Sequence, residues 1–171
     1  MSGTDVIDPL MNLAEIAAAF AGFAALVSVL RGRSVRIETA HNILRLRIVI
    51  SSSVLVVVAS LIPVGLVNFE MTDSVVWRVS AVTTLVLNYA VITSFVKSYQ
   101  PVQGKFPVDQ LALVVVGSME VADQAALLAV AFDLWPELNF ALFFVAMILN
   151  LSQAAFVFVR FVGSEFAAQN L

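Results

Sequence analysis

The sequence contains five apolar stretches that are each long enough to cross a lipid bilayer. They comprise residues 10–30, 48–68, 75–96, 108–132 and 138–162. A helix crosses a hydrocarbon core of roughly 30 Å with about 20 residues, which each stretch supplies. Backbone groups in lipid must bond within the protein, and the strict two-residue alternation of barrel strands is absent, so helices are expected. We therefore predict an all-α, polytopic transmembrane helical bundle of about five spanning helices.

The composition supports this fold class. Hydrophobic residues make up 61% and charged residues 12% of the 171 residues, and the mean hydropathy is +0.99. Too little of the chain remains outside the stretches for a soluble catalytic module, so residues 1–171 are expected to form a single integral membrane domain. The chain has no cysteine and one histidine, His41. Disulfides, thiolate chemistry and imidazole clusters for a metal or haem are therefore not expected.

The basic residues predict how the helices are oriented. Eight of the nine fall on one side of the predicted spans: Arg31, Arg33, Arg36, Arg45, Arg47, Lys97, Lys105 and Arg160. Only Arg78 falls on the other side. The positive-inside rule then predicts an N-terminus outside and a C-terminus in the cytoplasm, in a plasma or inner membrane. Trp77 and Trp135 are expected at the lipid–water interface, and nothing in the basic residues indicates nucleic-acid binding.

The first stretch carries a stripe of residues spaced three and four apart, which places them on one helix face. The stripe comprises Asp8, Asn12, Glu15, Ala19, Gly22, Leu26, Val29 and Arg33. Several copies around an axis would form a pore with Asn12 and Glu15 attracting cations at the outer mouth. Leu26 and Val29 would form an apolar constriction, with the small residues Ala19 and Gly22 between the two zones.

The alternative interpretation of this stretch is packing. Its many alanines, together with Gly22, provide the small-residue surface that lets membrane helices approach closely, and Gly22 and Leu26 would then only contact another helix. Glu15 favours the pore, because it lies about 7 Å inside the outer boundary of the stretch, where a solvated mouth would keep it charged. The sequence leaves both interpretations open.

The fourth stretch contains Glu120, Asp123 and Gln124, whose spacing places them on one helix face. Two carboxylates near the centre of a bilayer cost roughly 5 to 7 kcal/mol, more than the apolar residues of one helix return. This face must therefore contact protein or water. Two carboxylates at low dielectric are expected to resist ionising together and to share one proton, which suits proton binding or a weak cation site.

Hydrogen bonding between helices is the alternative role for these acidic residues. Asn88, Asn150 and Gln153 are candidate partners, and counting from the span boundaries gives Asn88 and Asn150 nearly the same depth as Glu120. Polar networks inside membrane proteins contribute about 0.6 to 2 kcal/mol per bond and can serve packing alone. Ion binding and helix packing are equally compatible with the pattern.

No catalytic constellation is found, because no serine with matching histidine and aspartate, no phosphate-binding glycine loop and no metal-spaced cluster is present. We therefore expect neither an enzyme nor a bound cofactor. The preferred hypothesis is a homo-oligomeric ion channel or ion-conducting protein in the lipid bilayer, with cations or protons as ligands. Two alternatives remain: an accessory membrane protein whose polar layer packs against partner helices, and a small proton-coupled carrier.

Overall fold

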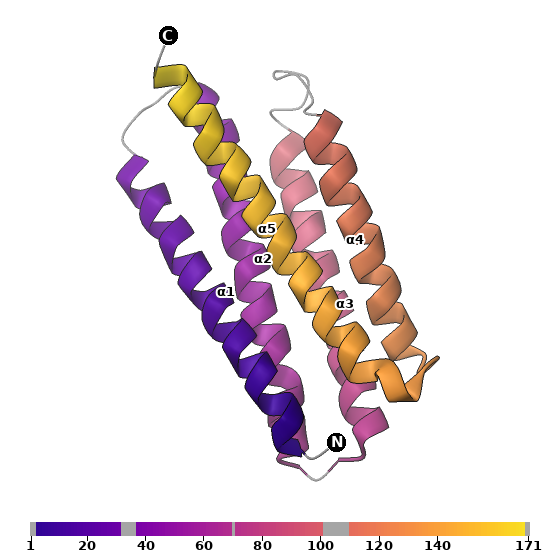
Figure 1. The fold of residues 1–171 in the computed structure, drawn as a ribbon. Helices are drawn as coiled ribbons and strands as arrows, with labels where there is room; N and C mark the ends of the chain where they lie inside the picture. Colours follow the sequence, from indigo (N-terminus) through magenta and orange to yellow (C-terminus); the bar gives the residue numbers. More distant parts are fainter. Residues whose placement is uncertain (1–2, 32–36, 70, 101–109, 170–171) are drawn as a thin grey trace.

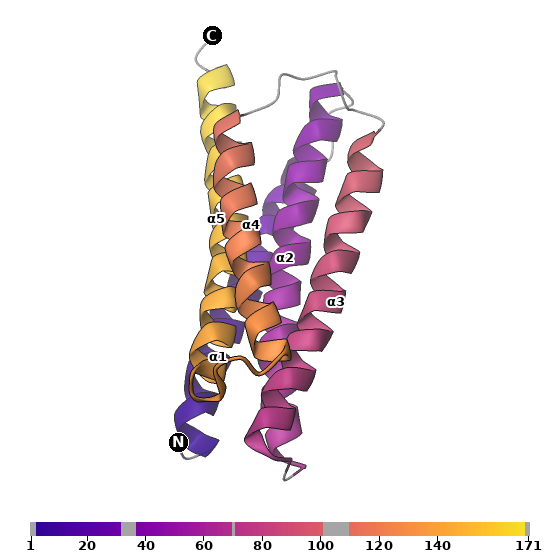
Figure 2. The ribbon, with the colours of Figure 1, turned by 90° about the vertical axis from the view of Figure 1, so that its right-hand side faces the viewer.

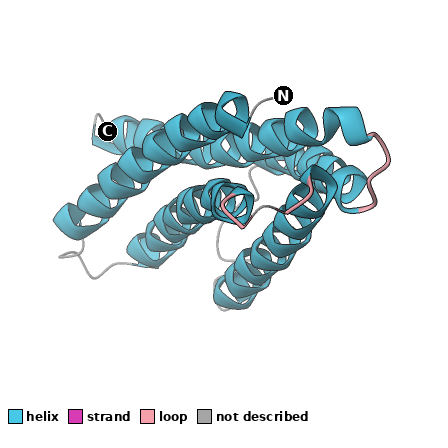
Figure 3. Cartoon of the chain, turned by 90° about the horizontal axis from the view of Figure 1, so that it is seen from below, coloured by secondary structure: helices cyan, strands magenta, loops and turns pink. Residues whose placement is uncertain are grey.

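The computed structural model describes residues 3–31, 37–69, 71–100 and 110–169. These residues form five long α-helices and one short 3-10 helix: α1 (Gly3–Arg31), α2 (Ile37–Val67), α3 (Asp73–Tyr99), α4 (Gln110–Ala131), η2 (Pro136–Leu138) and α5 (Asn139–Gln169). The described parts of the chain contain helices and connecting turns but no strand (Figure 3). The predicted all-α class is confirmed.

Each long helix contains a segment that is long and apolar enough to cross a membrane. The five segments are Ile7–Val29, Ile43–Val67, Asp73–Tyr99, Gln110–Ala131 and Pro136–Gly163. They match the five predicted stretches with shifted boundaries, and Val108 lies outside the described residues. The second segment also includes Arg45 and Arg47, before Ile48, because the helix continues through them and their long side chains can reach the interface from within a span. The chain is an integral membrane protein.

Helices α2, α3, α4 and α5 form a ring, and α1 packs on the outside of this ring (Figures 1 and 2). In the ring, α2 contacts α3 and α5, and α4 contacts the same two helices from the other side. Helix α1 packs mainly against α2 and makes few contacts with α5. An apolar groove of about 270 Å³ between α1 and α5 is lined by residues such as Phe20 and Ile148. One face of α1 is therefore left free of the bundle.

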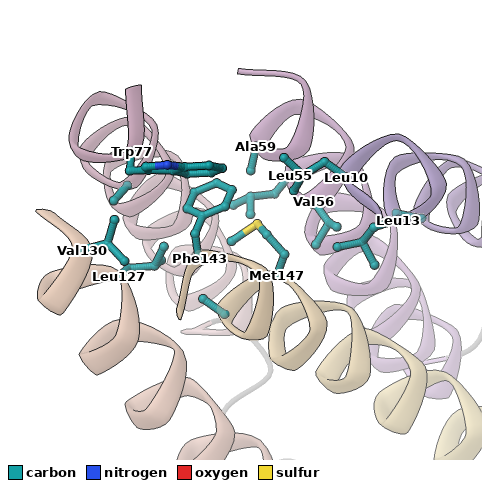
Figure 4. Close-up of a cluster of buried hydrophobic side chains, with 13 residues drawn as sticks. Leu10, Leu13, Leu55, Val56, Ala59, Trp77, Leu127, Val130, Phe143 and Met147 are labelled. Atoms are coloured by element: carbon teal, nitrogen blue, oxygen red, sulfur yellow. The ribbon is translucent and has the colours of Figure 1, made fainter. Parts of the chain in front are cut away.

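The main hydrophobic core lies toward the end of the bundle where α1 begins (Figures 1 and 4). Trp77 belongs to it, because the indole ring is only 8% exposed and lies 5.6 Å from the ring of Phe140 and 5.8 Å from that of Phe143. Trp77 lies near the start of the α3 segment, but the start of α5 covers its ring. Trp135 is 51% exposed, as an interfacial side chain would be.

Small residues on one face of α1 allow it to approach the bundle closely. The buried residues of this helix are Leu10, Leu13, Ala14, Ala17, Ala21 and Ala24. Ala17 and Ala24 are fully buried, and Ala24 joins a second core cluster with Leu46 and Phe158 near the other end of the bundle. These alanines serve the helix packing that membrane proteins achieve with small side chains. Ala19 and Gly22 are not among them.

The turn between α4 and α5 is fixed by Asp133. This residue adopts a left-handed backbone conformation with φ of 56°, which aspartate tolerates better than most residues. Its Oδ2 accepts a hydrogen bond from the Ser74 hydroxyl at 2.7 Å, and its Oδ1 accepts one from the Asn139 amide at 2.6 Å. These two hydrogen bonds, with a smaller contribution from the charge of Arg78, lower the pKa of Asp133. The carboxylate thereby connects the start of α3 to the start of α5.

Acidification is expected to weaken this connection. A carboxyl group with a lowered pKa in the folded protein stabilises the fold above its unfolded-state pKa of about 4, and the contribution disappears as the pH falls through the lowered value. The midpoint of thermal unfolding in detergent is therefore expected to fall between about pH 6 and about pH 3, and to fall less in Asp133→Asn than in the wild type. Glu137→Gln, a change at an exposed carboxylate of the same turn, is the control and is expected to behave as the wild type. Equal acid sensitivity of Asp133→Asn and the wild type would contradict this role.

Candidate functional site

The predicted acidic residues lie in two separate places in the structure. We call the first the polar cluster; it lies between α3, α4 and α5 and comprises Asn88, Glu120, Asp123, Gln124, Asn150 and Gln153. We call the second the α1 stripe; its described residues are Asp8, Asn12, Glu15, Ala19, Gly22, Leu26 and Val29. The carboxyl groups of Glu120 and Asp123 are part of one hydrogen-bond network, and Glu15 is not a member of it.

A single amide bridges the two carboxyl groups of the polar cluster. The Nδ2 of Asn88 donates to Oε1 of Glu120 at 3.1 Å and to Oδ2 of Asp123 at 3.0 Å. The carboxyl groups share this donor because Glu120 and Asp123 are three positions apart on α4, on the face that packs against α3. Asn88 is 3% exposed and Asp123 is fully buried, so this bridge is enclosed by protein.

Three further amides complete the cluster. Asn150 on α5 donates its Nδ2 to Oδ2 of Asp123 at 3.3 Å, and Gln124 donates its Nε2 to Oε1 of Glu120 at 2.9 Å. The Gln153 amide is assigned with its nitrogen toward Glu120, because this orientation satisfies both of its polar atoms and gives a 3.1 Å bond to Oε2. Amides from three helices thus surround two acidic side chains.

The chemistry of the polar cluster follows from the type of its donors. All four are neutral amides, which orient a carboxylate but bring no positive charge to compensate it. Oδ1 of Asp123 is buried and has no hydrogen-bond partner among the described residues. The arrangement can hold a proton or a small monovalent cation between Glu120 and Asp123. The described residues contain no group of three or more histidine, cysteine or acidic side chains that would hold a metal ion.

The α1 stripe lies on the face of α1 that points away from the other helices. All seven of its described residues are exposed, and Leu26 and Val29 are 56% and 77% exposed. Gly22 has no neighbouring atom within 4 Å of the position that a Cβ would occupy. Glycine inside a helix costs about 1 kcal/mol relative to alanine, and no contact with the described residues requires it here. Arg33, the predicted inner end of the stripe, lies outside the described residues.

One polar contact involves residues that the sequence did not single out. Arg47 on α2 donates to the hydroxyl groups of Ser94 and Ser98 on α3. The two serines are four positions apart and therefore share one face of α3, which is the only sequence signal that indicates them. Their partner cannot be inferred from the sequence, because the rotation of α2 about its axis decides which residue faces them.

The fold and the polar cluster define a polytopic helical membrane protein with two carboxyl groups inside its bundle. In comparisons with protein-family models, curated proteins and solved structures, the chain matches no family model, no curated protein and no solved structure. Its function must therefore be argued from its own residues.

Removing the bridging amide is expected to destabilise the bundle more than removing a peripheral one. Asn88→Ala deletes two hydrogen bonds, one to the buried Asp123 and one to the half-buried Glu120, and is expected to cost about 1 to 3 kcal/mol of unfolding free energy. Asn150→Ala deletes one longer bond and is expected to cost less. Denaturant unfolding of the purified protein in detergent measures both values. A cost for Asn150→Ala equal to or above that for Asn88→Ala would show that the bridge does not hold the cluster together.

Proposed function

We propose that the chain assembles into a homo-oligomer that conducts cations or protons across the membrane. The observation that carries this proposal is the exposure of Glu15 on the outer face of α1. Glu15 lies five positions after Leu10, where the predicted span begins, which corresponds to a depth of about 7 Å. A carboxylate facing the hydrocarbon of a bilayer costs up to about 3.5 kcal/mol at its centre, so Glu15 needs polar cover, which the described part of its own chain does not provide.

Further copies of the chain can supply that cover. The small side chains at Ala19 and Gly22 leave room for close approach of another helix. With several α1 stripes around one axis, Asn12 and Glu15 would line a hydrated mouth that attracts cations. Leu26 and Val29, further along the same face, would form an apolar constriction that opens and closes by wetting. The same exposed residues of the α1 stripe would thus both hold the subunits together and line the route of the ions.

The proposed orientation has the N-terminus outside and the C-terminus in the cytoplasm, in a plasma or inner membrane. Arg45, Arg47 and Lys97 lie at the end of the bundle opposite to Asp73 and Asp133. By the positive-inside rule, the end with the basic side chains faces the cytoplasm. The mouth with Glu15 then opens to the outside.

The polar cluster has a second role in this proposal. Neutral amides orient the buried Asp123 and the half-buried Glu120 but do not compensate their charge, so a proton or a cation is needed there. Each subunit would thus contain an exchangeable binding site at mid-membrane depth. Because donors come from α3 and α5, occupation of the site would also change how firmly α4 is held between them.

A second candidate function is that of an accessory membrane protein. The amide donors to Glu120 and Asp123 from three helices favour it, since such a network can serve helix packing alone. In that case the α1 stripe would contact a helix of another protein instead of a second copy.

Ion flux distinguishes the two functions. Purified protein in liposomes is expected to dissipate a potassium or proton gradient. Glu15→Gln is expected to slow this flux about tenfold, because a ring of carboxylates concentrates cations at the mouth by at least that factor. Glu137→Gln is the control, since Glu137 is an exposed carboxylate outside the long helices, and is expected to leave the flux unchanged.

The double variant Glu120→Gln, Asp123→Asn tests the polar cluster in the same assay and is expected to reduce flux. Both replacements have nearly the same shape as the original side chains, so the packing of the cluster is kept. Unchanged flux in both this variant and Glu15→Gln would eliminate the two proposed acidic sites. Absence of flux in the wild type, in liposomes where a control channel conducts, would favour the accessory function.

Crosslinking tests the assembly directly, because the natural chain contains no cysteine. Ala19→Cys is expected to give covalent dimers in membranes treated with an oxidant or a short bifunctional thiol reagent. Val121→Cys, which is 71% exposed on α4, is the matched control and is expected to remain monomeric under the same conditions. Failure of Ala19→Cys to crosslink, with thiol labelling showing that it is accessible, would contradict assembly through α1.

A further inference from the structure

A groove of about 440 Å³ runs between α2 and α3, apart from both the polar cluster and the α1 stripe. Its walls are mostly apolar, with Val54, Val58, Leu87 and Phe95 among the lining residues. Val54 and Val58 are 47% and 42% exposed, so the groove opens on the outer surface of the bundle. In a membrane this surface faces lipid, and an apolar groove there accommodates an acyl chain.

The length of the groove matches one leaflet. Arg47 and Val58 both line it and are eleven positions apart on α2, which corresponds to about 16 Å along the helix. Half of a hydrocarbon core of roughly 30 Å is about 15 Å. The groove therefore extends from the level of Arg47, near the start of the α2 span, to about the middle of the bilayer.

The positively charged side chain of Arg47 lies at the end of this groove that is nearer to the membrane surface. Arg47 donates its Nη1 to the Ser98 hydroxyl at 3.1 Å and its Nη2 to the Ser94 hydroxyl at 3.2 Å. Ser98 in turn donates to the backbone carbonyl of Ser94 at 2.8 Å, which orients its oxygen. The two serines hold the guanidinium between α2 and α3 beside the groove.

The charge of Arg47 is not neutralised by these contacts. Both acceptors are neutral hydroxyl groups, and its hydrogen-bond partners among the described residues include no carboxylate. A guanidinium group has five N–H donors in a planar fork that fits the oxygens of a phosphate. Arg47 is exposed, so donors beyond the two used for serine can reach a ligand from the lipid side.

We propose that an anionic phospholipid binds in this groove, with one acyl chain between α2 and α3 and its phosphate on Arg47. Basic pockets between transmembrane helices are suited to acidic headgroups. The charge of Arg47 selects an anionic headgroup over a zwitterionic one, and Arg45 and Lys97 at the same end of the bundle add to the positive potential. This site is independent of ion conduction and of the oligomeric state.

Lipid retention by the purified full-length chain tests the proposal. Delipidated protein is titrated with phosphatidylglycerol or with phosphatidylcholine of the same acyl chains, and bound lipid is counted by native mass spectrometry. The wild type is expected to prefer the anionic lipid about tenfold, as one or two charge-assisted hydrogen bonds would produce. Arg47→Gln is expected to lose this preference, and Arg78→Gln, at an exposed arginine on the opposite end of the bundle, is expected to keep it.

A second variant separates the groove from the charge. Val54→Trp fills the groove without removing Arg47 and is expected to weaken binding of both lipids, with thermal unfolding confirming that the variant is folded. Inorganic phosphate alone is expected neither to stabilise the protein nor to displace the lipid. Equal binding of the two lipids to the wild type, an undiminished preference in Arg47→Gln, or stabilisation by phosphate equal to that by the lipid would each overturn the proposal.

Discussion

The structure depends on one constraint: a carboxyl group inside a hydrocarbon layer needs polar cover. The chain meets this constraint within itself for Glu120 and Asp123, which receive amide hydrogen bonds from α3, α4 and α5. It does not meet it within itself for Glu15, which is exposed on α1. The cost of leaving such a group in lipid is a few kcal/mol, comparable to a large part of a small protein's stability. This difference between the two sites is the basis for proposing that α1 contacts a further helix.

The arrangement of the helices explains why the two sites differ. Because α2 to α5 form a ring, a polar residue on the inner face of α4 meets side chains from helices on both sides. Helix α1 lies outside this ring and buries only the face that contains Ala17 and Ala24. Its opposite face keeps Glu15 and Gly22 exposed, although neither residue is the choice that lipid contact would favour. One face of α1 thus packs on its own bundle, and the proposed assembly would cover the other.

The sequence predicted the fold class well because hydropathy alone defines five spans. It also placed Asn88 and Asn150 at the depth of Glu120 by counting along the predicted spans, and it named Gln153 as a further candidate partner. It did not predict which face of α1 packs inward, because alanines occur on all its faces. Nor did it predict the burial of Trp77. Lipid and protein interior are both apolar, so a membrane helix lacks the contrast between two faces that reveals rotation in soluble helices.

The similar polarity of lipid and protein interior also affects how subunits can associate. In lipid, apolar faces gain little from meeting one another, so association between subunits must come from close packing and from polar groups that escape hydrocarbon. On α1 these two features coincide, because Gly22 permits close approach and Glu15 needs cover. The residues that favour assembly would therefore be the residues at the shared axis. A dry interface would leave several carboxylates of like charge close together, which is unfavourable without counter-charge. In the proposed assembly, water and cations at that axis would relieve the repulsion, and for this reason we prefer a conducting assembly to a sealed one.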